Sequence, residues 1–300
     1  MFNEIIGNEK IKDLLTNSIK SNQTSHSYLF LGTEGIGKKL IAKEFAKNIL
    51  CLESENFECK KCKSCIEFLT NNNPDYTEIV PDGNSIKISQ IREMQKRIQE
   101  KPIISKNKVY IIDDADKMTP EAQNCLLKTL EEPPQFAKII LIGSNENTFL
   151  NTIKSRCTIL HFENLSNQEI SNFLKNNYNI TNLDEETLNI FQGSLKKAIE
   201  LKDKKDLYTD VKKVIEDFNK KDLIDILQEA EFIYKSKEDI TEILDYINTI
   251  LINKMKKEPD SCYFLKCIKI VEETKKRLKQ NSNYDMCIDN LLFNMWEEIN

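Results

Sequence analysis

The stretch that decides the fold is Gly32-Thr33-Glu34-Gly35-Ile36-Gly37-Lys38. It follows the short apolar run SYLFL at 27–31 and precedes an amphipathic helical pattern at 39–50. Between a strand and a helix, the backbone amides of such a turn form a nest for anions, and the helix N-terminus favours negative charge. The match to G-x-x-x-x-G-K predicts that the loop binds phosphate groups through Gly32, Gly35, Gly37 and Lys38. The alternative is a glycine-rich turn without phosphate chemistry.

Strand-like and helix-like segments alternate on either side of this loop. Apolar runs at 75–80, 109–112 and 138–142 are separated by helical patterns at 88–101 and 120–132. Such alternation is typical of parallel strands joined by crossover helices, so we expect an α/β domain over residues 1–163. From Ser166 onward the apolar residues follow a helical period, as at Val211, Ile215 and Phe218, and no strand pattern appears. We expect a small helical domain at 164–204 and a helical bundle at 205–300.

Two positions depart from the pattern of an active nucleotide hydrolase. The residue after Lys38 usually carries a hydroxyl that ligates Mg²⁺, and here it is Lys39, which cannot be a metal ligand. Asp113, which follows the run at 109–112, stands where an aspartate would hold Mg²⁺. Asp114 stands where a catalytic glutamate would be expected and is one methylene shorter, and a misplacement of about 1 Å can cost about a hundredfold in rate. ATP and Mg²⁺ are therefore doubtful cofactors. The alternative for Asp113 and Asp114 is a solvated acidic turn.

Four of the nine cysteines lie close together, at Cys51, Cys59, Cys62 and Cys65. Four thiols with two C-x₂-C spacings predict a closed, structural Zn²⁺ site. An iron–sulfur cluster is the first alternative, although the proline that ends a ferredoxin run is absent. Ordinary free cysteines are the second. The remaining cysteines are expected in the hydrophobic core: Cys125, Cys157, Cys262, Cys267 and Cys287.

Composition narrows the class of protein. The net charge is −5, which argues against a broad basic face for nucleic acid, so a zinc-dependent nucleic-acid-binding protein is the least favoured hypothesis. No apolar run approaches the ~20 residues needed to cross a bilayer. The first twenty residues are amphipathic and charged rather than typical of a secretory signal. We expect a cytoplasmic protein without membrane contacts.

Several motifs resemble those of bacterial clamp-loader subunits, which are AAA+ proteins of the DNA polymerase III holoenzyme. The resemblance covers residues 2–165 and rests on Phe2-x-x-Ile5-x-Gly7-Asn8, His26-x-Tyr28-Leu29-Phe30-x-Gly32, the segment LLKTLEEPP at 126–134, and Ser155-Arg156-Cys157. It implies an AAA+ P-loop domain with an inserted zinc module at 51–65, then a helical lid and an all-α collar that holds a ring together.

Within this family, Lys39 and Asp114 resemble the delta-prime type more than the ATP-hydrolysing gamma/tau type, which is the alternative. The resemblance implies a stator in a hetero-pentameric ring with gamma/tau and delta subunits, which loads the sliding clamp on primed DNA. The complex is a nucleotidyltransferase, while the chain itself is not expected to be an active ATPase.

The resemblance also assigns three site residues. Arg156 of the Ser-Arg-Cys motif would act as an arginine finger in the ATP site of a neighbouring subunit, although a lone arginine at a turn often forms a surface ion pair. Asn145 lies where the sensor-1 residue would be, and an asparagine that favours a turn at a strand end is its alternative. Lys196, in Gly193-Ser194-Leu195-Lys196, stands where the sensor-2 motif usually bears arginine.

Overall fold

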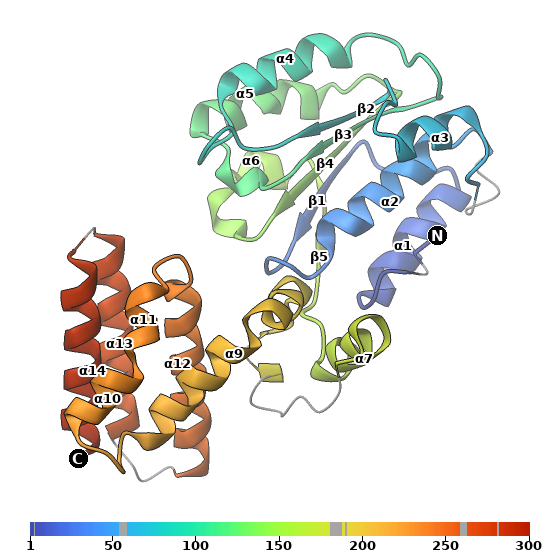
Figure 1. Ribbon diagram of the computed structural model, residues 1–300. Helices are drawn as coiled ribbons and strands as arrows, with labels where there is room; N and C mark the ends of the chain where they lie inside the picture. The colour runs from blue at the N-terminus through green and yellow to red at the C-terminus, as the bar shows by residue number, and fades with distance from the viewer. Residues whose placement is uncertain (3, 54–58, 181–187, 190, 259–262, 281) are drawn as a thin grey trace. The chain divides into compact units, whose positions relative to one another are not determined.

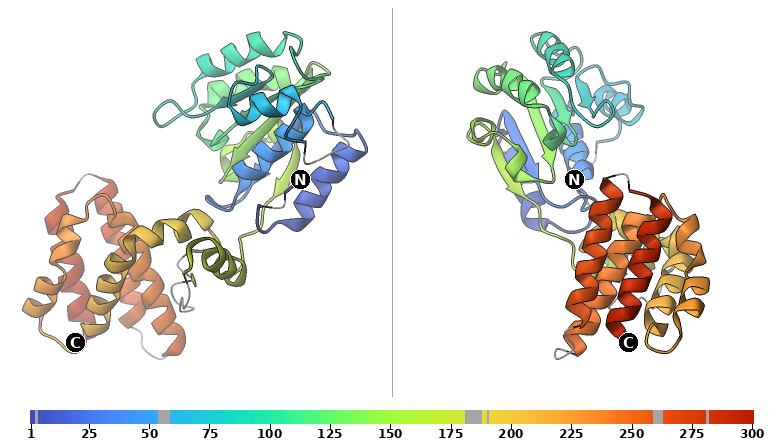
Figure 2. Two further views of the ribbon diagram at one scale, coloured as in Figure 1. Left: turned by 45° about the vertical axis from the view of Figure 1, so that its right-hand side comes forward. Right: turned by 90° about the vertical axis from the view of Figure 1, so that its left-hand side faces the viewer.

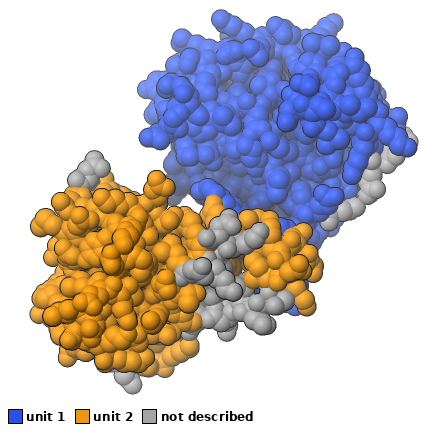
Figure 3. All heavy atoms as spheres, in the orientation of Figure 1, with its two compact units in different colours: residues 1–173, 193–196 blue, residues 174–192, 197–300 orange. Residues whose placement is uncertain are grey.

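The computed structural model describes the chain except for residues 3, 54–58, 181–187, 190, 259–262 and 281 (Figure 1). It divides into two compact units, which Figure 3 colours separately. The first holds residues 1–173 and 193–196, and the second holds residues 174–192 and 197–300. The predicted boundaries at 163 and 204 stay predictions.

The first unit contains a five-stranded parallel sheet of strand order β2-β3-β4-β1-β5. The strands are β1 (Ser27–Leu31), β2 (Tyr76–Ile79), β3 (Lys108–Ile112), β4 (Ala137–Gly143) and β5 (Thr158–His161). The predicted strands correspond to β1, β2, β3 and β4. Strand β5 was not among them.

Helices cover both faces of this sheet (Figure 2). The elements between and around the strands are α1 (Glu9–Lys20), α2 (Lys38–Leu50), α3 (Lys63–Leu69), α4 (Ile88–Ile98), η1 (Ala115–Lys117), α5 (Pro120–Glu131), η2 (Glu146–Thr148), α6 (Asn151–Lys154) and α7 (Asn167–Tyr178). The 3.6-residue apolar patterns predicted α2, α4 and α5 with ends within three residues of those observed. Helix α5 begins where Thr119 caps it by accepting a hydrogen bond from Ala122 N, with Pro120 in its first turn.

Alternating residues of each strand build two hydrophobic cores. Leu29, Tyr110 and Leu141 pack with residues of α4 and α5 on one face. Phe30, Ile111 and Ile140 pack with residues of α1 and α2 on the other. Because the central strands β1, β3 and β4 are buried on both faces, they are rich in apolar residues. Burial of each such side chain contributes roughly 1.5–3 kcal/mol, and this rigid sheet fixes the loops at the strand ends.

Beyond residue 162, the described residues form helices and turns, and no strand occurs among them. Helix α9 (Leu195–Asp217) is kinked at Lys204, where φ is −118° and ψ is 15°. The remaining helices of the second unit are α10 (Leu223–Glu229), α11 (Glu231–Lys235), α12 (Ile240–Lys257), α13 (Tyr263–Lys279) and α14 (Tyr284–Ile299). Helix α13 packs against both α12 and α14, and each of the three helices carries fully buried side chains, such as Leu244, Val271 and Leu291. Within the described part of the chain, no helix is long and apolar enough to cross a lipid bilayer.

Candidate functional site

The glycine-rich loop connects β1 to α2, in the setting that the sequence predicted. Gly37 precedes α2 with φ of 94°, and Gly35 has φ of 81°, a left-handed conformation that side chains rarely adopt. A Cβ atom on Gly35 would lie 2.1 Å from Ser194 Oγ and 2.8 Å from Lys196 Cβ. The loop therefore needs glycine at residue 35 both for its backbone and for close packing against residues 194–196.

Lys38 is buried and bends back onto its own loop. Its Nζ donates to the carbonyl oxygens of Gly32 and Thr33, each at 2.6 Å. Burial lowers the pKa of Lys38, while the nearby carboxylates of Asp116 and Glu34 act in the opposite direction. A phosphate group could take the place of these two carbonyls, since a lysine ammonium can turn its three N–H donors between partners.

Lys39 forms ion pairs with two carboxylates beside the glycine-rich loop. Its Nζ lies 2.8 Å from Asp113 Oδ2 and also contacts Glu78 Oε1. Burial alone would lower the pKa of Lys39, but hydrogen bonds to Asp113 and Glu78 outweigh it and raise the pKa. The residues present do not fit a Mg²⁺ site, because the expected hydroxyl ligand is absent and Asp113 is already paired with a cation.

Glu78 is a member of this site that the sequence did not reveal. It lies on β2, and its Oε2 atom is 2.8 Å from Lys43 Nζ, one helical turn after Lys39. Burial would raise the pKa of Glu78, yet hydrogen bonds from Lys39 and Lys43 prevail and lower it. Two lysines on one face of α2 thus neutralise two carboxylates, Asp113 and Glu78.

Asp114 adopts a left-handed backbone with φ of 48°, and its carboxylate forms an ion pair with Lys117 Nζ at 2.8 Å. Its neighbour Asp116 instead accepts a hydrogen bond from Ser144 Oγ at 2.8 Å. The acidic segment after β3 is therefore held by local contacts. These contacts leave Asp114 with a lysine partner where the resemblance would place a catalytic acid.

Asn145 and Lys196 both have partners within the first unit. Asn145 Oδ1 accepts from Asn147 N at 3.0 Å and caps η2, which is the turn-forming role that the sequence left open. Lys196 Nζ lies 2.8 Å from Glu34 Oε1, and the backbone N–H groups of Leu195 and Lys196 both donate to Gly35 O. Residues 195–196 therefore contact the glycine-rich loop directly. The sensor roles of Asn145 and Lys196 stay predictions.

Arg156 follows the short helix α6 and is one-third exposed. Its Nη1 atom donates to Thr152 O at 3.0 Å and to Ser155 Oγ at 3.1 Å. Its Nη2 atom lies 2.7 Å from Glu131 Oε1, at the end of α5. The guanidinium thus rests on three acceptors of its own chain, and its role in another subunit stays a prediction.

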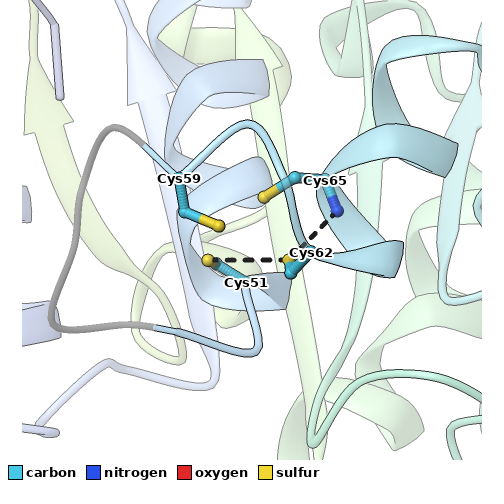
Figure 4. A group of neighbouring side chains, drawn as sticks. All are labelled: Cys51, Cys59, Cys62 and Cys65. Carbon is cyan, nitrogen blue, oxygen red and sulfur yellow. Dashed lines mark hydrogen bonds between the residues drawn. The ribbon is translucent and has the colours of Figure 1, made fainter.

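The four clustered cysteines converge, as the close-up in Figure 4 shows. The sulfur atoms of Cys51, Cys59, Cys62 and Cys65 all lie within 4.8 Å of one another, and Cys51 Sγ is 4.0 Å from Cys62 Sγ. Cys62 Sγ also accepts a hydrogen bond from Cys65 N at the start of α3. In a tetrahedral Zn–S₄ site with bonds of 2.3 Å, the sulfur atoms would lie about 3.8 Å apart. The cluster therefore fits one metal ion such as zinc.

The thiols of this cluster differ in acidity. Burial raises the pKa of Cys51 to about 11, whereas backbone N–H groups of Leu52 and Cys65 outweigh burial and lower the pKa of Cys62 to about 7. A bound cation would supply the compensation that four thiolates need. Of the other cysteines, Cys267 and Cys287 are buried, and Cys125 and Cys157 pack half-buried against the sheet core. Cys262 lies outside the described residues.

A parallel sheet with a phosphate-type loop after β1 and acidic residues after β3 defines a P-loop domain of AAA+ type. The family described as DNA polymerase III, delta subunit, matches residues 7–166, which is more than half of the 300 residues. The chain belongs to this family.

Its relatives include several DNA polymerase III subunits. Subunit delta' of Bacillus subtilis is 40% identical over 165 residues, which is 55% of this chain and 50% of that protein. Subunit tau/gamma of Haemophilus influenzae is 36% identical over 58% of this chain and 25% of its own length. The gamma subunit of Buchnera aphidicola (subspecies Schizaphis graminum) is 36% identical over 67% of this chain and 57% of its own length. The chain thus spans 50% of the delta' relative, 25% of the tau/gamma relative and 57% of the gamma relative.

A solved structure gives the fold independently. A DNA polymerase III gamma subunit-related protein of Thermotoga maritima superposes with a TM-score of 0.54 at 19% identity, covering 95% of this chain and 99% of that one. The expected resemblance to bacterial clamp-loader subunits is confirmed. Because delta' and gamma/tau subunits both occur among the relatives, similarity alone does not separate these two types.

Proposed function

We propose that the chain is a delta-prime-type clamp-loader subunit of DNA polymerase III that does not hydrolyse ATP itself. The observation that carries this proposal is the ion pair between Lys39 and Asp113. Hydrolysis in P-loop proteins needs Mg²⁺ held between a hydroxyl of the loop and the acidic strand end. Here a lysine ammonium takes both the sequence position of the hydroxyl and the contact with the aspartate.

The proposed contribution to catalysis is Arg156, which would enter the ATP site of a neighbouring subunit. A guanidinium fixed near a γ-phosphate stabilises the charge that develops there, and such fingers contribute about 10³–10⁵ in rate. Its partly exposed position after α6 supports this role. In the same proposal, gamma/tau and delta subunits complete the ring, and the sliding clamp and primer–template DNA are its substrates.

The other proposed parts are structural. Cys51, Cys59, Cys62 and Cys65 would hold one Zn²⁺ ion, with no open coordination position for catalysis. Residues 205–300 would form the collar that assembles the ring. Exposed apolar side chains on its helices, among them Leu265, Met286 and Phe293, support an interface there.

The alternative is an ATP-hydrolysing gamma/tau-type subunit, which the intact G-x-x-x-x-G-K motif and the gamma/tau relatives favour. Calorimetric titration of ATP, with Mg²⁺ and with a chelator, separates the two. The proposal expects weak or undetectable binding that Mg²⁺ does not strengthen. Tight Mg²⁺-dependent binding that Lys38→Ala abolishes would establish the alternative.

A further inference from the structure

The contact between Arg156 and Glu131 joins two segments that are far apart in the sequence. Glu131 is the last residue of α5, and Arg156 follows α6. The Arg156 Nη2–Glu131 Oε1 distance is 2.7 Å, and the two side chains are 33% and 49% exposed. Both side chains are therefore partly exposed to solvent and accessible to another molecule.

Helix stability does not explain an acid at this position. The C-terminal end of a helix carries partial negative charge, so a carboxylate in its last turn is unfavourable. Glu132 is a second acid directly after Glu131, and no ion pair of Glu132 occurs among the described residues. Of these two adjacent acids, only Glu131 forms an ion pair with an arginine. This difference indicates that Glu131 helps to hold the Arg156 side chain in place.

Three acceptors hold the guanidinium of Arg156. An arginine has five N–H donors, and three of them are used, by Thr152 O, Ser155 Oγ and Glu131. Two donors are left over. A free arginine side chain samples many rotamers, and each of the three acceptors restricts that sampling. Thr152 O and Ser155 Oγ are neutral, so Glu131 is the charged member of the set.

We propose that Glu131 is a positioning residue for Arg156. It orients the guanidinium at the end of α6 so that the remaining N–H donors face the γ-phosphate of a nucleotide bound by the neighbouring subunit. This inference rests on the proposed function, because it requires that Arg156 acts in trans. The alternative is that Glu131 and Arg156 form an ordinary surface ion pair, which has no effect on the rate of ATP hydrolysis.

The test uses the complete loader, reconstituted with the gamma/tau-type and delta-type partners of the same organism. Steady-state ATP hydrolysis is measured with clamp and primed DNA, for the parent and for Glu131→Ala, Glu131→Gln, Glu132→Ala and Arg156→Ala in this chain. Glu131→Ala should lower kcat by about two- to fivefold, the range that partly exposed ion pairs carry, with KM for ATP unchanged. Glu131→Gln keeps an acceptor for Arg156 and should recover most of the rate. Glu132→Ala, the matched neighbour, should behave as the parent.

The outcomes separate this inference from the proposed function. If Arg156→Ala abolishes hydrolysis at its site while Glu131→Ala equals the parent, Glu131 does not position the finger, although the proposed function stands. A faster rate in Glu131→Ala would also overturn the inference, because the carboxylate would then restrain the finger. If Arg156→Ala leaves the rate unchanged, the finger itself is wrong and the inference fails with it. Sedimentation of each complex checks assembly. If the loader with Glu131→Ala does not assemble, the ATP hydrolysis rate of Glu131→Gln is compared with that of the parent instead.

Discussion

Lys39→Thr should make ATP binding depend on Mg²⁺, a dependence that the proposed function predicts to be absent from the parent chain. In the structure, Lys39 and Lys43 balance Asp113 and Glu78, so two positive and two negative charges sum to zero. Removing one lysine leaves a charge of −1. Glu78 keeps its ion pair with Lys43 at 2.8 Å, so Asp113 is the carboxylate that loses its cation. The new threonine hydroxyl stands directly after Lys38, where a Mg²⁺ ligand is expected.

The size of the effect follows from the contact that is lost. The Lys39–Asp113 pair is 2.8 Å long, but the lysine is 40% exposed, so solvent screening limits the pair to about 1 kcal/mol at most. A Mg²⁺ ion at the same carboxylate should gain a similar amount, because its larger charge is offset by the cost of removing its water. Since 1.4 kcal/mol corresponds to tenfold in affinity, Mg²⁺ should strengthen ATP binding to Lys39→Thr by up to about fivefold.

Titration calorimetry with ATP, in excess Mg²⁺ and in a chelator, measures this ratio directly. Lys43→Met is the matched control, because Lys43 shares helix α2 and the partner Glu78 but does not contact Asp113. Its ratio, like that of the parent chain, should stay near one. The reasoning is refuted if the parent chain already binds ATP about fivefold more tightly with Mg²⁺, or if Lys39→Thr shows no gain.

Three further predictions concern stability and metal content. Glu78→Gln should lower the free energy of unfolding by about 1 kcal/mol at neutral pH. The pKa of Glu78 is depressed in the folded state, so the difference in stability between parent and variant persists above the ordinary pKa of 4.5. It shrinks as the pH falls below that value. Urea titrations across pH 3–7 measure it, and a difference that grows on acidification would contradict the ion-pair account. Cys59→Ser should abolish binding of one zinc ion per chain, measured by elemental mass spectrometry, whereas Cys125→Ser, outside the cluster, should keep it; equal zinc in both variants would exclude the cluster as the site. Gly35→Ala should lower the free energy of unfolding by about 2 kcal/mol, because its φ of 81° is strained for alanine and residue 194 fills the space of a Cβ; a variant as stable as the parent in urea would show that the loop rearranges freely.

The sequence predicted the central sheet because its strands are buried on both faces. Strands β1, β3 and β4 are fully buried along their length, and each contains a run of four apolar residues, at 28–31, 109–112 and 139–142. Strand β5 escaped prediction since only Leu160 of its four residues is buried, and Thr158 and His161 are exposed. A strand at the sheet edge with only one fully buried side chain lacks the pattern that marks its neighbours.

In the candidate site, too, some residues could be predicted from the sequence and others could not. The motif located Lys38 and Asp113, and chemistry alone made Lys39 a poor metal ligand. Glu78 could not be predicted, because its proximity depends on β2 lying beside β3, and strand order is a tertiary property. The partner of Arg156 was likewise hidden, since Glu131 is 25 residues away in the sequence.

The most direct test of the account compares two substitutions in this chain within the reconstituted loader. ATP turnover is measured with Lys38→Ala, which disables the chain's own phosphate loop, and with Arg156→Ala, which removes the proposed finger. We expect an unchanged rate for Lys38→Ala and a large loss for Arg156→Ala at the neighbouring site. A loss of turnover with Lys38→Ala and none with Arg156→Ala would contradict it and identify the chain as a working ATPase.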